Sequence, residues 1–413
     1  MRGLDIGVAG CGVAGLAAAL LLKKAGHSVT LYERFAAPRP VGSGLMIQPT
    51  GLAVLEKLGL AGRLCALGAP ISRLFGKVVP SGKIVLDVHY DWLRLQGARG
   101  VAVHRPALFA LLHDAVLEAG VPIETCRTVS GTRLLPDGRR CVLFEGGESQ
   151  AHDLVVDALG SASPLAGETG RSLAYGALWA SLDWPGGSFS EELLEQRYRR
   201  ASVMAGVLPI GRARDGGTPQ AAFFWSLRAD HLAQWRERGL EAWKQDVRAV
   251  WPETAPFLDE IETAEQLTFA RYSHRTLRTP AEPALIHIGD AWHSTSPQLG
   301  QGANMALLDA WALAKALEEA SDLDGALAAA AAMRRSHVRL YQALSAIFTP
   351  AYQSDGRLMP FLRDVVVPPF GRRWPATRIQ AAMLAGTFGG ALRPLALEAG
   401  VYASCSSLSS AGA

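Results

Sequence analysis

A glycine-rich turn between an apolar strand and an apolar helix most strongly limits what this chain can fold into. Residues 6–9 are expected to form a buried strand, and Gly10-Cys11-Gly12-Val13-Ala14-Gly15 follows at once. An apolar helix then closes near Ala25, and residues 28–32 are the next expected strand. A strand, a tight glycine turn, a helix and a second strand in this order predict one unit of a doubly wound α/β sheet.

Each part of this turn has a physical task in binding a dinucleotide. Gly10 permits the tight turn, Gly12 lets the backbone approach a pyrophosphate, and Gly15 lets the helix and the strand pack closely. Val13 and Ala14 open the helix, whose N-terminus offers unpaired N–H groups and a positive dipole end to phosphates.

Glu33 stands at the end of the second strand, where an acid accepts hydrogen bonds from ribose hydroxyls. Arg34 follows it and is included among the cofactor-binding residues, although we expect its side chain to face solvent. A glycine-rich helix start without a ligand would explain the glycines alone. Strand, turn, helix, strand and acid in the right order instead predict dinucleotide binding.

A second glycine-rich segment lies far downstream and follows another expected strand, residues 285–289. Asp290 stands at the end of that strand, and a helix is expected to begin near Ala303. An N-cap in a plain strand-to-helix turn would explain Asp290 alone. That interpretation does not explain the loop that follows, Pro297-Gln298-Leu299-Gly300-Gln301-Gly302-Ala303-Asn304.

Together and in this order, the two segments resemble the FAD-dependent class A aromatic monooxygenases, the p-hydroxybenzoate hydroxylase-like flavoproteins. The resemblance covers residues 3 to 345 and implies that FAD is the cofactor. It implies that Asp290 binds a ribityl hydroxyl and that the Pro297–Gly302 loop, with Gly300, lies near the isoalloxazine ring. It also implies that the N-terminus of the helix at Ala303 and Asn304 points at the N1/O2 edge, where negative charge develops on reduction.

Two further positions are implied by the same resemblance. Arg105, in Val103-His104-Arg105-Pro106, matches an arginine near the ribityl and phosphate groups, and Val129 matches a residue beside adenine. A surface arginine at a helix start and a buried strand valine would look the same.

A third motif of the family departs from its usual pattern here. In the family an aspartate, followed by glycine, contacts the FAD ribose, and an arginine further on serves the nicotinamide cofactor. Leu159 and Ala166 occupy these two positions, while Gly160 and Ser163 remain. Leucine cannot accept a hydrogen bond and alanine cannot hold a phosphate, so the use of NAD(P)H stays open. Asp157 lies two residues earlier and faces the same way as Leu159. We expect that its carboxylate does not reach as far toward the cofactor as an acid at position 159 would.

The expected fold class is α/β, with a Rossmann-like FAD-binding domain, an inserted β-sheet substrate domain and a helical C-terminal region. The FAD-binding domain is expected to be discontinuous and to contain residues 1–70, 96–170 and 273–345. The substrate domain is expected from residues 71–95 and 171–272, where long strands are predicted to cover the flavin. Residues 346–413 form the expected helical region.

The resemblance implies that the enzyme hydroxylates an aromatic or polyketide-like small molecule with O2, through a flavin C4a-hydroperoxide. Such chemistry needs an apolar pocket with few polar anchors. Candidate lining residues are Trp179, Phe223, Trp225 and Tyr272. Trp292 either crowds the flavin or packs in the core, and His274 and His293 are weak candidates for an acid or base, so no catalytic residue is assigned.

Composition limits the remaining possibilities. The net charge is +3 with scattered charges, which gives no indication of nucleic-acid binding. The 5 cysteines show no CxxC spacing and no metal-ligand pattern, which favours a reducing, cytoplasmic compartment without a metal or a disulfide framework. Glycines and charges interrupt every long apolar stretch, so no membrane span is expected.

Two alternatives to a monooxygenase remain open. The first is an FAD-dependent oxidase, dehydrogenase or isomerase of the same fold that does not use NAD(P)H efficiently, which Leu159 and Ala166 favour. The second is a non-catalytic FAD-binding or ligand-binding protein. The intact Pro297–Gly302 loop argues against it, because such a protein has no need of bare backbone beside a flavin ring.

Overall fold

The computed structural model describes residues 1, 3–37, 43–167, 170–366, 371 and 373–402. Its first layer is a six-stranded sheet in the order β20-β21-β12-β1-β2-β8. The four central strands and β8 pair in parallel, and only β20 is antiparallel to its neighbour. In sheet order the strands are Ala281–Glu282, Leu285–His287, Leu154–Asp157, Asp5–Ala9, Ser28–Tyr32 and Ile123–Glu124.

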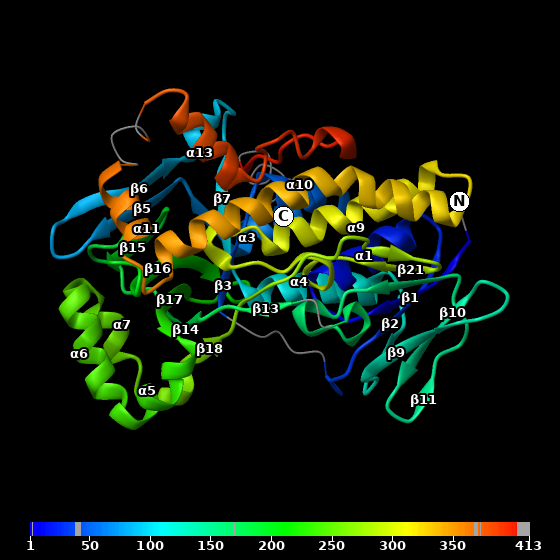
Figure 1. Cartoon of the computed structure of the whole chain (residues 1–413), viewed down its shortest axis with the longest axis horizontal. Helices are drawn as coiled ribbons and strands as arrows, with labels where there is room; N and C mark the ends of the chain where they lie inside the picture. The colour runs from blue at the N-terminus through cyan, green and yellow to red at the C-terminus, as the bar shows by residue number, and fades with distance from the viewer. Residues whose placement is uncertain (2, 38–42, 168–169, 367–370, 372, 403–413) are drawn as a thin grey trace.

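Helices cover this parallel sheet and enclose the largest apolar core. α1 is buried along nearly its whole length, because its sequence is apolar on every side, and it packs on both α9 and α4. Figure 1 shows α9 and α10 as two long neighbouring helices that run along the molecule. The helices of this layer are α1 (Val13–Lys24), α2 (Pro49–Leu58), α3 (Ala61–Leu67), α4 (Arg105–Glu118), α8 (Asp290–His293), α9 (Gly302–Glu319) and α10 (Leu323–Tyr352).

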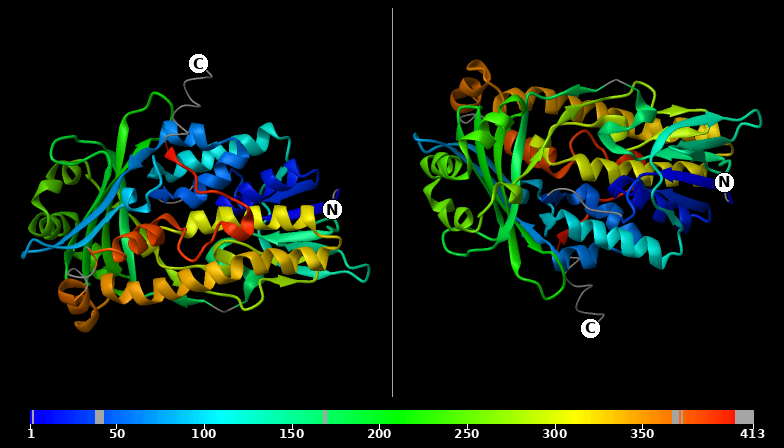
Figure 2. Two further views of the ribbon diagram at one scale, coloured as in Figure 1. Left: turned by 90° about the horizontal axis from the view of Figure 1, so that it is seen from above. Right: turned by 90° about the horizontal axis from the view of Figure 1, so that it is seen from below.

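A second, mostly antiparallel sheet has seven strands in the order β18-β14-β17-β16-β15-β5-β6. In that order the strands are Thr268–Ala270, Tyr175–Asp183, Pro219–Arg228, Val203–Arg212, Leu193–Arg199, Arg73–Val78 and Lys83–His89. Three short helices, α5 (Leu232–Arg238), α6 (Leu240–Val250) and α7 (Ala255–Asp259), pack on its outer face. Figure 2 shows this sheet standing between those helices and the rest of the molecule.

Three small sheets complete the strands. β3 (Gly44–Ile47), β7 (Gly100–His104) and β4 (Ala69–Ile71) form one of them, and β13 (Arg171–Ser172) pairs with β19 (Ser273–His274). β10 (Arg140–Phe144) belongs to the third of these sheets. It lies between β9 (Val129–Leu134) and β11 (Gly147–Glu148) in a separate antiparallel sheet.

The predicted α/β fold class is therefore confirmed, but one expected boundary is wrong. α10 continues through residue 346 and ends at Tyr352, so the C-terminal region does not begin there as a separate element. Among the described residues, the remaining α-helices are α11 (Leu358–Phe361) and α13 (Ala376–Ala385). No helix in the described part of the chain has the length and apolar character needed to cross a membrane.

The two faces of the seven-stranded sheet separate the aromatic residues expected in a pocket. Trp179 on β14 pairs with Phe224 on β17, and their rings lie 4.7 Å apart on the inner face. Phe223 and Trp225 point to the outer face, where both rings contact Trp243 of α6. The expectation that Phe223 and Trp225 line the same pocket as Trp179 was wrong, because side chains alternate along a strand and only Phe224 shares its face.

Candidate functional site

Two glycines shape the turn after β1 and leave no room for a side chain. Gly10 has a φ of +104°, and a Cβ on Gly15 would lie 1.9 Å from the Gly10 carbonyl oxygen. Gly12 differs, because no heavy atom lies within 4 Å of the place its Cβ would take. Gly10 and Gly15 therefore serve the fold, while Gly12 presents bare backbone to a space that a phosphate can enter.

The two glycine-rich segments meet in space. Val13 and Ala14 form the first turn of α1, and a Cβ on Gly289 would lie 3.1 Å from the Ala14 Cβ. Gly289 has a φ of +59° and caps α8, so Asp290 follows directly beside the turn after β1. We call the region bounded by Gly12, Asp290 and the start of α9 the candidate site.

Glu33 is held against the glycine turn by the backbone. Its carboxylate accepts hydrogen bonds from the backbone N–H of Cys11 at 3.1 Å and of Phe35 at 3.0 Å. A carboxylate has lone pairs beyond these two bonds, so it can also accept hydrogen bonds from hydroxyl groups. Arg34 is exposed and lies over the Phe35 ring, 4.5 Å from its centroid, as expected for a solvent-facing strand end.

Asp290 opens α8 directly after Gly289, and its side chain is exposed. It forms no hydrogen bond or ion pair with any residue in the described ranges. Burial raises the pKa of its carboxyl, and His293 and Arg105 oppose that rise. A carboxylate that is accessible and has no protein donor fits a ligand that brings a hydroxyl group.

Arg105 connects the two halves of the candidate site. It is the first residue of α4, is exposed, and donates its backbone N–H to the Ser43 carbonyl oxygen at 2.7 Å. Its charge acts to lower the pKa of Asp290 and that of Tyr272. The charge of Arg105 therefore acts on both the carboxylate from α8 and the phenol that follows β18.

The loop before α9 presents bare backbone at Gly302, since no heavy atom lies within 4 Å of its missing Cβ. Pro297 begins a 3₁₀ turn, and Gly300 ends it in the left-handed region with a φ of +60°. Gly302 and Ala303 form the first turn of the 18-residue helix α9. The positive end of that helix dipole therefore faces the candidate site.

The Asn304 side chain has a structural task that the sequence did not indicate. It is fully buried and accepts the Gln48 backbone N–H at 2.8 Å. Its amide also donates to the carbonyl oxygens of Met46 at 3.1 Å and Gly300 at 3.0 Å. The side chain thus fastens the loop before α9 to the end of β3, while a contact of this helix start with the cofactor stays a prediction.

A buried charge network behind the candidate site was missed by sequence reasoning. Asp309 on α9 accepts hydrogen bonds from the Gly289 backbone N–H at 2.9 Å and from Arg334 Nε at 2.8 Å, and it pairs with His293 Nε2 at 2.6 Å. Burial opposes ionisation, but His293 and Arg334 outweigh it and lower the pKa of Asp309 to about 2. The sequence carried one signal for this network, since Asp309 and Arg334 are charged residues on otherwise apolar helix faces.

Two residues beside Asp290, His293 and Trp292, are buried behind the candidate site. His293 is buried against Asp309 and holds the turn at Gly289, so it does not reach into the candidate site. Trp292 packs with Met305, and its indole N–H donates to the Leu277 carbonyl oxygen at 3.3 Å. Trp292 is therefore core, which decides between the two alternatives for it.

The wall of the candidate site on the side of the seven-stranded sheet is aromatic. Trp179 Nε1 donates to the Tyr272 hydroxyl oxygen at 3.0 Å, and Phe224 lies beside Trp179. Burial raises the pKa of Tyr272 to about 12. His274 follows nearby, where its Nε2 lies 3.3 Å from the Ser296 backbone N–H and burial lowers its pKa.

At the end of β12, the Asp157 carboxylate holds the turn that contains Leu159. It accepts hydrogen bonds from the Leu159 backbone N–H at 3.0 Å and from the Ser163 hydroxyl at 2.6 Å. It also pairs with His287 Nδ1 at 2.7 Å. That Asp157 reaches less far toward the cofactor than an acid at position 159 would stays a prediction.

The two residues that depart from the family pattern are apolar and packed. Leu159 contacts a small core cluster that contains Tyr32 and Val129. Ala166 is buried at the end of a short 3₁₀ turn. Val129 is also buried. Its position agrees with both interpretations given above, a contact to adenine and a plain core valine.

The chain matches a family model described as FAD binding domain over residues 4–339. The 3-amino-4-hydroxybenzoate 2-monooxygenase of Streptomyces cremeus is 27% identical over 367 residues, 83% of this chain and 83% of the relative. The aurachin C monooxygenase/isomerase of Stigmatella aurantiaca is 27% identical over 348 residues, 80% of this chain and 85% of the relative.

Solved structures show the same fold. HpxO from Klebsiella pneumoniae, crystallised with FAD and uric acid, superposes with a TM-score of 0.76 at 19% identity, covering 94% of this chain and 98% of that chain. The tetrameric form of 2-methyl-3-hydroxypyridine-5-carboxylic acid oxygenase gives a TM-score of 0.75 at 22% identity, covering 95% and 98%. The chain therefore belongs to the FAD binding domain family of flavoprotein monooxygenases, and FAD is its cofactor.

Proposed function

We propose that this protein is an FAD-dependent monooxygenase that inserts one oxygen atom from O2 into an electron-rich aromatic or enolic small molecule. The observation that carries the proposal is that the two glycine-rich segments meet, since a Cβ on Gly289 would lie 3.1 Å from the Ala14 Cβ. Asp290 follows Gly289, and Gly12 and Gly302 both present bare backbone. The charge of Arg105 also acts to lower the pKa of Asp290 and of Tyr272.

The residues present fit FAD. Bare backbone at Gly12 suits the pyrophosphate, and Glu33 has lone pairs left for ribose hydroxyls. Asp290 lacks a protein donor and suits a ribityl hydroxyl. When bound at this site, FAD supplies the electron transfer and the oxygen activation.

The start of α9 supplies the electrostatics for a reduced ring. Gly302 leaves bare backbone N–H groups at the positive end of an 18-residue helix. That end stabilises negative charge placed beside it. Asn304 keeps the loop in place through three hydrogen bonds, so these donors are held ready before a ligand binds.

Tyr272 acts as a hydrogen-bond donor to the substrate. Because Trp179 donates to its oxygen at 3.0 Å, the phenol keeps its own hydrogen for a ligand oxygen. A pKa of about 12 keeps this phenol protonated at neutral pH. Arg105 favours an anionic oxygen at the same place, as in a phenolate, an enolate or a carboxylate, and Phe224 supplies apolar surface beside it.

The test is product analysis with a panel of hydroxybenzoates, hydroxypyridines and quinolones under ¹⁸O2. We expect one substrate class to give a product with one labelled oxygen. Tyr272→Phe should raise the KM of that substrate about tenfold, because one hydrogen bond to a charged group is lost. Phe223→Leu, on the outer face, is the matched control and should leave KM unchanged. Stoichiometric hydrogen peroxide without labelled product would contradict the proposal.

A second candidate function is an FAD-dependent oxidase, dehydrogenase or isomerase that uses NAD(P)H poorly. Leu159 and Ala166 favour it, since neither can bind a phosphate or a ribose hydroxyl. Asp157 weakens that argument, because its carboxylate keeps the turn ordered without an acid at position 159. Stopped-flow reduction decides: flavin reduction that saturates at micromolar NADPH or NADH supports the monooxygenase, and no reduction by either supports the second candidate.

The proposal includes three further expectations, which concern the domains, the partners and the location. The substrate half consists of residues 71–95 and 171–272, and the FAD-binding half of 1–70, 96–170 and 273–345, with α10 continuing past 345. The partners are a small aromatic molecule and O2. The proposed location is cytoplasmic, because the 5 cysteines show no CxxC spacing in the sequence.

A further inference from the structure

The C-terminal end of α13 is held by side chains from three other parts of the chain. The last residues of this helix are buried, and the carbonyl groups at a helix end have no partner within the helix. Three consecutive carbonyl oxygens each accept one side-chain hydrogen bond instead. The pairs are Tyr341 Oη to Met383 at 2.9 Å, Gln301 Nε2 to Leu384 at 2.6 Å and Thr50 Oγ1 to Ala385 at 3.3 Å.

One of these three donors, Gln301, belongs to the loop before α9. Its side chain is 2% exposed, and its own carbonyl oxygen accepts the Met305 backbone N–H at 2.9 Å. The backbone of Gln301 is therefore already part of the first turn of α9, directly before the bare backbone of Gly302. The hydrogen bond to Leu384 thus connects the start of α9 to α13, which lies beyond the residues 4–339 that match the family model.

Gly386 keeps this connection close. It follows α13 with a φ of +81°, and a Cβ there would lie 2.4 Å from Thr50 Oγ1 and 2.8 Å from Gln301 Oε1. Any side chain at this position would displace one or both of these groups, and both are buried. The distance between the end of α13 and the loop before α9 is therefore fixed by backbone on one side and by Gln301 on the other.

We propose that Gln301 is a positioning residue for the cofactor and that α13 holds the start of α9 in place through it. The N–H groups at a helix start stabilise negative charge on a reduced ring only while they stay aimed at it. Without the bond to Leu384, the first turn of α9 loses this support and stabilises that charge less. The proposal rests on the proposed place of the flavin ring beside this loop, and it requires neither a substrate nor oxygen insertion.

The test is the two-electron reduction potential of the FAD-loaded full chain, titrated spectrophotometrically against a dye of known potential. Gln301→Met removes the donor at nearly constant volume. We expect the affinity for reduced FAD to fall about tenfold relative to that for oxidised FAD, which lowers the potential by about 30 mV. Tyr341→Phe is the matched control, because it removes the bond to the neighbouring carbonyl of Met383 from outside the loop. It should lower the urea midpoint as Gln301→Met does and leave the potential unchanged.

A second pair of variants acts from the side of α13. Gly386→Ala should lower the potential in the same direction as Gln301→Met, because the new Cβ displaces the Gln301 side chain. Gly390→Ala is its control, since Gly390 has a similar φ of +73° but no heavy atom lies within 4 Å of its missing Cβ. It brings the same backbone strain without the contact, so the potential should stay at the wild-type value.

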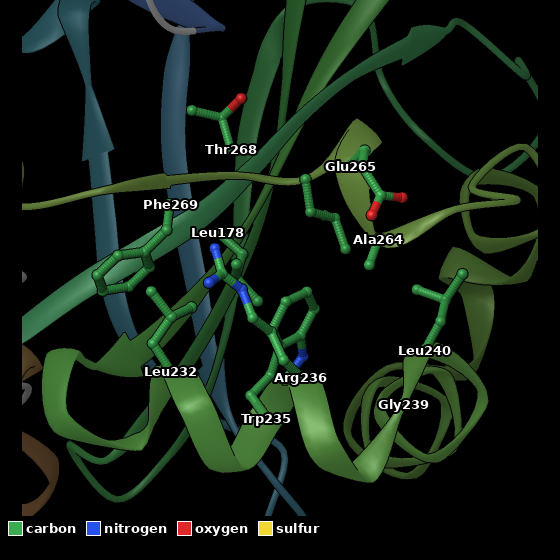
Figure 3. Close-up of a pocket in the computed structure, with 11 residues that line it drawn as sticks. Leu178, Leu232, Trp235, Arg236, Gly239, Leu240, Ala264, Glu265, Thr268 and Phe269 are labelled. Carbon is green, nitrogen blue, oxygen red and sulfur yellow. The ribbon is translucent and has the colours of Figure 1, made fainter.

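Arg236→Gln controls for a distant change of charge. Arg236 lies at a surface pocket between β14, β18, α5 and α6, on the outer face of the seven-stranded sheet (Figure 3). This variant should also keep the wild-type potential. A wild-type potential in Gln301→Met, or an equal shift in Gln301→Met and Tyr341→Phe, would overturn the proposal. Product analysis under ¹⁸O2 tests the proposed function separately, because the potential is measured without substrate and without oxygen.

Discussion

The ends of β1 and β12 lie side by side, since Ala9 and Asp157 are partners in the parallel register, yet they are built by opposite means. After β1, the turn requires residues without a side chain, because Gly10 and Gly15 have no room for a Cβ. After β12, the turn depends on a side chain, the Asp157 carboxylate, which binds Leu159 N–H and the Ser163 hydroxyl.

The difference shows which kinds of site residue can change position in a sequence. A glycine required by a close backbone contact has a fixed position, because the contact belongs to the backbone. A carboxylate that orders a turn acts through its oxygens, and a neighbouring residue can supply them. Leu159 therefore removes an acid from the expected position, while Asp157 still holds the turn from two residues earlier.

The largest effect is expected at Gly15. Gly15→Ala would place a Cβ 1.9 Å from the Gly10 carbonyl oxygen, a backbone atom that cannot move aside easily. We expect the free energy of unfolding to fall by at least about 3 kcal/mol and FAD loading to be lost. Gly131→Ala is the control, because its Cβ would lie 3.5 Å from Leu143, an ordinary contact. Urea unfolding of both apo-variants checks this, and similar midpoints would show that the turn adapts.

The glycine turn after β1 was predictable because its residues form one short segment of the sequence. The glycines, Glu33 and Asp290 all stand at strand ends, where a local pattern indicates their place. Asn304 was only half predicted, since its position at the start of α9 was right and its task as a fastener to β3 was not.

The side chains that depend on long-range contacts could not be predicted. The network of Asp309, His293 and Arg334 joins α8, α9 and α10, and no spacing in the sequence indicates that these helices meet. Phe223 was assigned to the wrong face because an apolar strand buried on both sides shows no alternation. The register with Trp179 decides the face, and only the structure supplies it.

At β12, Asp157→Asn tests the other half of the comparison. The amide nitrogen cannot accept the hydrogen bonds of Ser163 and His287, so buried donors lose their partner. We expect a loss of about 3 kcal/mol in the free energy of unfolding. Asp137→Asn, an exposed surface change, should cost much less. Denaturant melts of the pair would refute the role of Asp157 if the two variants unfold together.

Acid should unfold the region behind the site through Asp309. Its pKa of about 2 in the folded protein lies below the ordinary aspartate value of about 3.9, so the folded state favours the ionised form. The stabilisation is complete above about pH 4 and is lost as the pH falls from there toward 2, a change of about 2 to 3 kcal/mol. Asp309→Asn should flatten this part of the stability curve. An unchanged pH dependence between pH 2 and 4 in that variant would exclude Asp309 as its source.

Asp290 and Arg34 compare two polar residues at strand ends. Asp290→Ala should weaken FAD binding by about 1.5–3 kcal/mol, because it removes a charge-assisted hydrogen bond to the cofactor. Arg34→Ala should change it little, since Arg34 is exposed and lies over Phe35. Flavin fluorescence titrations give both dissociation constants, and equal values would contradict the placement of Asp290 beside the cofactor.

FAD titration of Gly12→Ala tests most directly the claim that bare backbone after β1 holds the cofactor. A methyl group there meets no protein atom within 4 Å, so it should leave the unfolding of the apo-protein unchanged. It would stand where the pyrophosphate approaches, and we expect FAD to bind at least about tenfold more weakly than in wild type or in Gly131→Ala. FAD affinity equal to wild type would contradict the account.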